Sequence, residues 1–269
     1  MRRPLIAAFM IASATMALAT DPGLAQQGQQ PQLPLPPGGF KPLPPAPVKP
    51  YQPVAVTPPA PLNDPSFVAF RQELGQVVAR KNRAAVGKLV VAQGFFWIQD
   101  KDVADPHKSG FDNLAKAVGL DAQDDSGWQT LAGFASEPSG AESPQQEGVF
   151  CAPADPNLDP NALEALAKAT QTDPTEWGFP NKNGVEVHAA AQLDSPVIEK
   201  LGMNLVRVLS DTRPPSNPNE PFLLHAATPS GKAGFVDAQA VAPLGGDQMC
   251  YIKQGGAWKI AGYLGGASP

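Results

Sequence analysis

Apolar residues recur at steps of three and four in the stretch that follows Asp64, which predicts a helix with one buried face. These residues are Phe67, Phe70, Leu74, Val77 and Val78. Asp64 followed by Pro65 is a typical helix start, because the Asp side chain caps the first turn and proline fits the first helical position.

Three shorter helices are expected over residues 82–90, 108–120 and 124–138. Asn82 caps the first of them, Ser109 and Asp112 form a capping pair for the second, and Gly119 fits its end. Between the first two, "FFWIQD" predicts a short strand or a core plug, with the lining of a ligand pocket as the alternative. Residues 64–138 therefore form a small, mostly α domain.

Residues 139–183 contain a linker and then one packing helix. "SGAESPQQEG" has linker composition, and Asp159-Pro160 repeats the Asp-Pro helix start. Asp173-Pro174 begins another turn, which carries Trp177. Helix capping explains these acidic residues without a metal ion.

From residue 184 the pattern changes to a period of two, which indicates strands. Six short strands are expected in "GVEVHAA", "NLVRVLSD", "FLLHAAT", "GKAGFVD", "QMCYIKQ" and "AWKIAGYL". Gly255 and Gly256 supply the positive φ of a two-residue hairpin turn. We predict an α+β chain whose residues 184–266 form one small, closed or nearly closed β-barrel.

The N-terminal pattern predicts export. Arg2 and Arg3 precede an apolar run that is too short for a spanning helix, and small residues follow it, so residues 1–25 are expected to be a secretory signal peptide. Cleavage leaves no transmembrane anchor, and the expected location is the periplasm, with the extracellular space as the alternative. Residues 26–63 are rich in proline and are expected to be a disordered linker. Their P-x-x-P spacing is also typical of ligands of aromatic grooves.

Charge and cysteine content narrow the function classes. The net charge of −5 argues against nucleic acid as a partner. Two cysteines, Cys151 and Cys250, are expected to form one disulfide in an oxidising compartment, with two buried thiols as the alternative. That bridge would close a loop of about 100 residues, for which chain entropy gives at most roughly 4.7 kcal/mol.

Two segments of the expected barrel, "VEVHAAAQLDSPVIEKLGMNLVRVL" and "TPSGKAGFVDAQAV", resemble the bacterial Src-homology-3-like domain over residues 184–264. That family has a strand of the V-x-V-R type, a turn of the sPVI-x-x-L-x-x-G type and a closing dGk-x-GWV segment. Gly231-Lys232, Gly234 and Val236 match it, whereas Phe235 stands in the tryptophan position and His188 in the arginine position. The resemblance implies a barrel that binds cell-wall peptidoglycan or a peptide partner.

Aromatic and basic residues of the expected barrel are the candidates for ligand contacts. They are Phe235, Trp258 and Tyr263, with Arg207 and Lys232 as partners for a carboxylate. Aromatic side chains supply rigid contact area, and tyrosine and tryptophan add one hydrogen-bond donor. The alternation leaves open whether Trp258 and Phe235 belong to the core instead.

The sequence predicts neither catalysis nor a cofactor. The three histidines have no partner at metal-ligand spacing, so no metal is expected. Cys151 with His188 or His225 could form a thiol hydrolase of wall peptides, but Cys151 does not open a helix that would support a thiolate. The leading hypothesis is an exported, non-catalytic binding or accessory protein. The alternatives are the Cys-dependent hydrolase and a purely structural subunit of an envelope complex.

Overall fold

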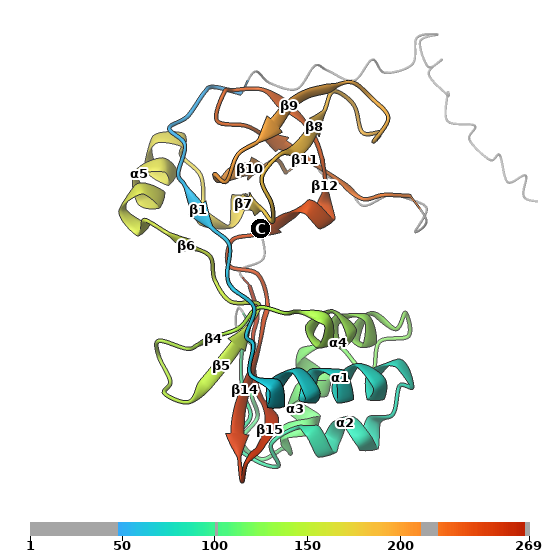
Figure 1. Ribbon diagram of the computed structural model, residues 1–269. Coiled ribbons are helices and arrows are strands. Elements are labelled where there is room, and N and C mark those ends of the chain that lie inside the picture. Colours follow the sequence, from blue (N-terminus) through green and yellow to red (C-terminus); the bar gives the residue numbers. More distant parts are fainter. Residues whose placement is uncertain (1–47, 100–101, 211–219, 267–269) are drawn as a thin grey trace, which may run out of the picture. The chain divides into compact units, whose positions relative to one another are not determined.

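Figure 1 shows the computed structural model, which describes residues 48–99, 102–210 and 220–266. The expected signal peptide and residues 26–47 of the expected linker lie outside the described residues. The described chain combines helices with β-sheets, which confirms the α+β class. Its two larger sheets define the names used below: the six-stranded part (residues 61–154 and 245–266) and the seven-stranded part (residues 48–60 and 155–244).

The six-stranded part is built on a sheet with the strand order β3-β2-β15-β14-β5-β4. Its strands are β2 (Phe96–Gln99), β3 (Asp102–Val103), β4 (Ala141–Glu142), β5 (Val149–Ala152), β14 (Gln248–Gln254) and β15 (Ala257–Leu264). All neighbours are antiparallel except β2 and β15, which run parallel. Gly255 and Gly256 have φ values of 60° and 83°, so the predicted hairpin turn between β14 and β15 is confirmed.

Four helices belong to the same part, and their starts agree with the sequence pattern. They are α1 (Pro65–Ala79), α2 (Arg83–Leu89), α3 (Gly110–Ala117) and α4 (Ser126–Ser136). The Asp64 carboxylate accepts from the Ser66 amide at 2.7 Å, and the Asn82 and Ser109 side chains accept from the third amide of their helices. These caps satisfy amides that have no partner within the helix.

The helices and the sheet enclose a single large core. Phe67 and Leu74 of α1 are fully buried, and the Phe67 ring meets Tyr251 at 5.0 Å and Trp258 at 4.9 Å, edge to face. Phe95 and Trp97 are also buried, so β2 and the residue before it contribute side chains to the core. Burying each large apolar side chain contributes about 1.5–3 kcal/mol, which makes this core the main stabilising element of the six-stranded part.

The seven-stranded part holds a sheet with the order β13-β7-β10-β11-β12-β8-β9. Its strands are β7 (Trp177–Pro180), β8 (Val185–His188), β9 (Val197–Leu201), β10 (Val206–Val208), β11 (Leu223–Ala227), β12 (Ala233–Asp237) and β13 (Val241–Pro243). Apolar residues occupy both faces. One cluster contains Val187, Val206 and Val236, and the other contains Trp177 and Leu205.

The second cluster is completed by elements that precede the sheet in the chain. Helix α5 (Pro160–Thr170) contributes Leu166, and the extended segment 48–57 contributes Val54 and Val56. Asp159 caps α5 through the Asn161 amide at 2.9 Å, as the Asp-Pro pattern predicts. Two short strands, β1 (Val56–Thr57) and β6 (Asn157–Leu158), pair with each other beside this cluster.

The structure divides the C-terminal strands differently from the prediction. All six predicted strands exist, but β14 and β15 pair with β5 and β2 of the six-stranded part and not with the strands of residues 184–243. Within the described residues, no pairing joins the outer strands β13 and β9, so the expected closed barrel over 184–266 is not found. A period of two identifies a strand and its faces, whereas the choice of sheet depends on partners far away in the sequence.

Residues 48–63 also differ from the expected linker. Val54 and Val56 are buried, and Leu62 packs against the core of the six-stranded part. The reason is that apolar residues alternate with exposed ones between the prolines, which gives this stretch one side that can be buried.

Candidate functional site

A groove of about 1030 Å³ lies in the seven-stranded part. One wall is the extended segment 48–54, the opposite wall is α5, and residues of β10 and β11 form the floor. Its size matches that of pockets that hold small molecules or short peptide segments. Two smaller hollows, of about 490 Å³ and 280 Å³, are more open.

The helical wall of the groove is made of small side chains. Ala162, Ala165 and Ala169 line it together with Leu166, since α5 repeats alanine at steps of three and four. Methyl groups leave space for a ligand and offer it an apolar surface. This wall therefore suits a ligand with small apolar groups.

The charged residues that line the groove are cations. Lys49 and Arg207 are among its lining residues, and none of the described lining residues is acidic. The whole chain carries a net charge of −5, whereas the described charged residues that line the groove are basic. A ligand with a carboxylate is the electrostatic match for such a surface.

Arg207 is oriented by an ion pair. Its Nε and Nη2 donate to Oε2 of Glu176 at 3.2 and 2.7 Å, and both side chains are about one-third exposed. Partial burial alone would raise the pKa of Glu176, but hydrogen bonds from the Asp173 amide and the Arg207 guanidinium outweigh it and lower the pKa. Glu176 stays ionised near neutral pH and fixes the guanidinium at the groove floor.

Tyr51 joins the extended segment to the sheet. Its hydroxyl donates to the backbone carbonyls of Leu205 at 3.2 Å and Ala227 at 2.9 Å, and its ring meets Trp177 edge to face at 5.0 Å. Burial raises the pKa of Tyr51, so the hydroxyl keeps the proton that it donates. Tyr51 is thus both a fixed wall of the groove and an anchor for residues 48–54.

His225 lines the floor of the groove, and Phe235 stacks against it. The two rings are nearly parallel, with centroids 4.7 Å apart, and both residues occupy directly paired positions of β11 and β12. His188, in the arginine position of the resemblance, pairs with Phe235 from the other side, and its Nδ1 lies 3.1 Å from the Ser195 carbonyl oxygen. Phe235 therefore stabilises the groove indirectly, by packing against His225.

Lys232 lies away from the groove lining in a polar turn. Its Nζ donates to the Ile198 carbonyl at 3.0 Å and lies 3.7 Å from the Glu199 carboxylate. The same carboxylate accepts from Thr228 at 3.0 Å and Ser230 at 2.7 Å. The structure does not bring Lys232 together with Arg207 as a pair of carboxylate ligands.

Trp258 and Tyr263 are core residues of the six-stranded part, which for Trp258 is the alternative that the alternation left open. Trp258 is 6% exposed and its Nε1 donates to Ser66 Oγ at 2.9 Å. Tyr263 is 2% exposed and its hydroxyl donates to Asp247 at 2.5 Å. Both lie on β15, whose inward face packs under the helices.

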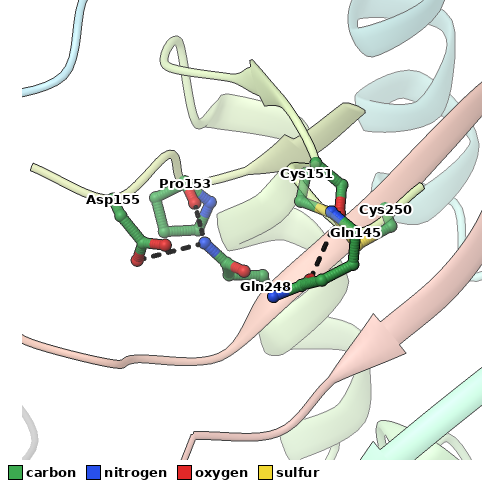
Figure 2. Close-up of a disulfide and its surroundings, with 7 residues drawn as sticks. Gln145, Cys151, Pro153, Asp155, Gln248 and Cys250 are labelled. Atoms are coloured by element: carbon green, nitrogen blue, oxygen red, sulfur yellow. Dashed lines mark hydrogen bonds between the residues drawn. A yellow bond between two sulfur atoms is a disulfide. The ribbon is translucent and has the colours of Figure 1, made fainter. Parts of the chain in front are cut away.

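The two cysteines form the expected disulfide between paired positions of β5 and β14 (Figure 2). Cys151 and Cys250 are buried beside Val149 and make a small apolar cluster. Next to them, Gln248 Nε2 donates to the Pro153 carbonyl at 2.8 Å. In this form Cys151 has no thiol, and the geometry gives no support to a cysteine nucleophile.

Within the ranges that the structure describes, no cluster of three or more His, Cys, Asp or Glu side chains could hold a metal ion. Within the same ranges, no helix has the length and apolar content needed to cross a bilayer.

Comparisons with known proteins identify no family for this chain. No protein family and no curated protein matches it. One similar solved structure is named as a calcium/calmodulin dependent protein kinase II association domain from Xanthomonas campestris. It is 12% identical, covers 79% of this chain and 95% of that one, and has a TM-score of 0.23. A likeness at that score carries no argument about fold or function.

Sequence reasoning found Arg207 but missed the rest of the groove. Tyr51, Lys49 and the alanine face of α5 were not among the candidates, because the first two lie in the proline-rich stretch and the alanines have no polar group. A signal was present in "PYQPVAV", where a tyrosine and two valines recur within an otherwise polar and proline-rich segment.

Proposed function

We propose that this chain is an exported, non-catalytic binding or accessory protein, and that its seven-stranded part is a Src-homology-3-like module that binds a short peptide. The peptide is part of cell-wall peptidoglycan or belongs to a protein partner. In both cases the recognised chemistry is the same: an extended backbone with small apolar side chains and a free carboxylate.

The observation that carries the proposal is the groove beside α5. An alanine-lined wall and two cations, Lys49 and Arg207, face one hollow of about 1030 Å³. Stem peptides of peptidoglycan carry methyl side chains and carboxylates, which match these two features. Export is supported by the basic and apolar pattern of residues 1–25 and by the disulfide, since disulfides persist in oxidising compartments.

The direct test is co-sedimentation of residues 26–269 with purified peptidoglycan sacculi at low and high salt. We expect retention that weakens with salt but persists, because the groove combines charge with apolar surface. Arg207→Gln should reduce retention roughly tenfold, the effect of losing about 1.4 kcal/mol from a charge-assisted hydrogen bond. Lys200→Gln is the matched control, because Lys200 pairs with Glu186 on the same part and is 65% exposed.

The two sources of peptide give different results. Retention on sacculi together with competition by a soluble stem peptide supports the wall as the ligand. Binding of a carboxylate-terminated protein peptide without retention on sacculi supports a protein partner. Absence of both, with the groove variants folded, would leave the chain as a structural accessory subunit and reject the binding function.

A further inference from the structure

Residues 50–57, which we call the strap, form backbone hydrogen bonds with neighbouring segments of the seven-stranded part. The Leu205 amide donates to the Val54 carbonyl at 2.9 Å, and the Val56 amide donates to the Met203 carbonyl at 3.0 Å. On the other side, β1 pairs antiparallel with β6. The strap therefore lies as an added strand between residues 203–205, which precede β10, and β6, which precedes α5. This is the geometry of β-strand addition.

From Pro53 to Thr57 the side chains of the strap alternate between exposure and burial. Tyr51, Val54 and Val56 face the protein, and the two valines are only 4% and 5% exposed. Gln52, Pro53, Ala55 and Thr57 are exposed. Backbone pairing with side-chain pockets at selected positions is how peptide-binding sheets recognise an extended segment.

The start of the strap has its own recognition elements. The Tyr51 amide donates to the Pro229 carbonyl at 3.1 Å. Pro50 lies against Gly231, where an added Cβ would come within 2.8 Å of the proline ring and where φ is +83°. Glycine at this turn thus permits the close approach of Pro50. Proline at positions 50 and 53 restricts the free segment to extended conformations, which lowers the entropy lost on binding.

We propose that this site is a peptide-binding site that the chain fills with its own strap, and that it accepts the same Pro-Tyr-x-Pro-Val segment from a second copy of the chain. A second copy is the occupant because its strap has, by identity, the anchors that the site requires. Leu62 packs on the core of the six-stranded part, and Ala60 and Pro61 before it are exposed, so the chain can bend there and a strap can leave one copy and enter another, which is domain swapping. The partner copy's Tyr51 and Lys49 would then complete the groove wall.

The proposal is independent of wall binding. Sacculi can fail to retain the protein while strap exchange occurs, and strap exchange can fail while sacculi bind. The two experiments therefore separate the two proposals.

The test uses the chain from residue 26 to 269 and a fluorescent peptide of residues 46–58. In Tyr51→Ala the resident strap loses its anchor, so the variant should bind the peptide, and a peptide carrying the same Tyr51→Ala change should bind about tenfold more weakly or less. Thr57→Ala is the matched control, since Thr57 is exposed and does not line the groove, and it should behave like the wild type, in which the resident strap excludes the peptide. Mixing wild-type chain with the Tyr51→Ala variant should give a heterodimer in sedimentation velocity.

A second design covers the case in which Tyr51→Ala does not fold. A protease site is inserted after Ala60, and the purified chain is cleaved, so that the strap is held only by non-covalent contacts. We expect it to co-elute with the body and to be displaced by excess peptide of residues 46–58. A folded body that never exchanges its strap, or a folded Tyr51→Ala variant that does not bind the peptide, would overturn the proposal and make the strap a permanent strand.

Discussion

The two parts of the molecule bury their apolar residues in different ways. In the six-stranded part, helices α1 to α4 and one sheet face enclose a continuous core with Trp97, Trp128 and Trp258. In the seven-stranded part, apolar residues are spread over both faces of a sheet, in two small clusters, and one of these depends on the strap and α5.

This difference suggests a division of roles. The continuous core makes the six-stranded part rigid, and the hollow on that part is smaller and more open than the groove. In the seven-stranded part, the groove lies where the strap, α5 and the sheet meet. The six-stranded part is accordingly the scaffold in our proposal, and the seven-stranded part is where recognition occurs.

The largest expected effect is that of Trp258→Ala. Removing a buried tryptophan costs about 3–5 kcal/mol, because transfer energy is lost and a cavity remains. We expect a large fall in the denaturant midpoint, measured by circular dichroism. Gln254→Ala, at the exposed end of β14, should leave it unchanged. A fully stable Trp258→Ala chain would refute the core assignment.

Loss of the disulfide should have the next largest effect. The double change Cys151→Ser and Cys250→Ser opens a loop with a sequence separation of 99 and should destabilise the chain by about 2–5 kcal/mol. The fluorescence of Trp177, the tryptophan of the seven-stranded part, should change less than that of the other three in partial denaturant. Equal changes in all four would mean that the two parts unfold together.

Tyr51→Phe tests the seven-stranded part more gently. It keeps the ring against Trp177 and removes the hydroxyl that donates to two carbonyls, so we expect a loss of about 1 kcal/mol. Hydrogen exchange should increase at the Leu205 and Val56 amides, which hold the strap, and not at amides of β14. Uniform exchange would indicate that the strap is not a local unit.

The smallest expected effect is that of Glu176→Gln, and it depends on pH. The pKa of Glu176 is lowered in the folded chain, so its stabilising contribution is complete above the unfolded value of about 4.3 and is lost as the pH falls through the folded value. The partly exposed ion pair contributes no more than about 1 kcal/mol. The melting temperatures of variant and wild type should therefore differ slightly at pH 7 and converge in acid. A difference that persists at pH 3 would contradict this account.

The features that the sequence predicted are local ones. Helix starts at Asp64, Asn82 and Asp159 followed from caps within three residues, and the hairpin at Gly255 followed from backbone freedom at one turn. Sheet membership was not predictable in the same way. Strands β14 and β15 have the same alternation as β11 and β12, and only contacts with β2 and β5, about 100 or more residues away, decide where they pair.

The same limit applies to the candidate site. Arg207 was found because a basic residue in a strand is conspicuous. Trp258 was left open between ligand surface and core, because an eight-residue strand does not reveal which of its faces is covered. Tyr51 was missed because it lies among prolines, in a segment whose buried side the prolines obscure. Helix α5 was predicted, but a wall of alanines becomes a binding feature only when another element lies opposite.

The position of β14 and β15 has a consequence for how the protein is made. Together they form the two central strands of the six-stranded sheet, yet they follow all the other described helices and strands in chain order. Until β14 and β15 have been synthesised, the apolar faces of α1 to α4 lack the two central strands that cover them. Such late, long-range pairing slows folding and prolongs the exposure of sticky surface. We therefore expect the apolar faces of these helices to stay partly exposed until the hairpin of β14 and β15 forms.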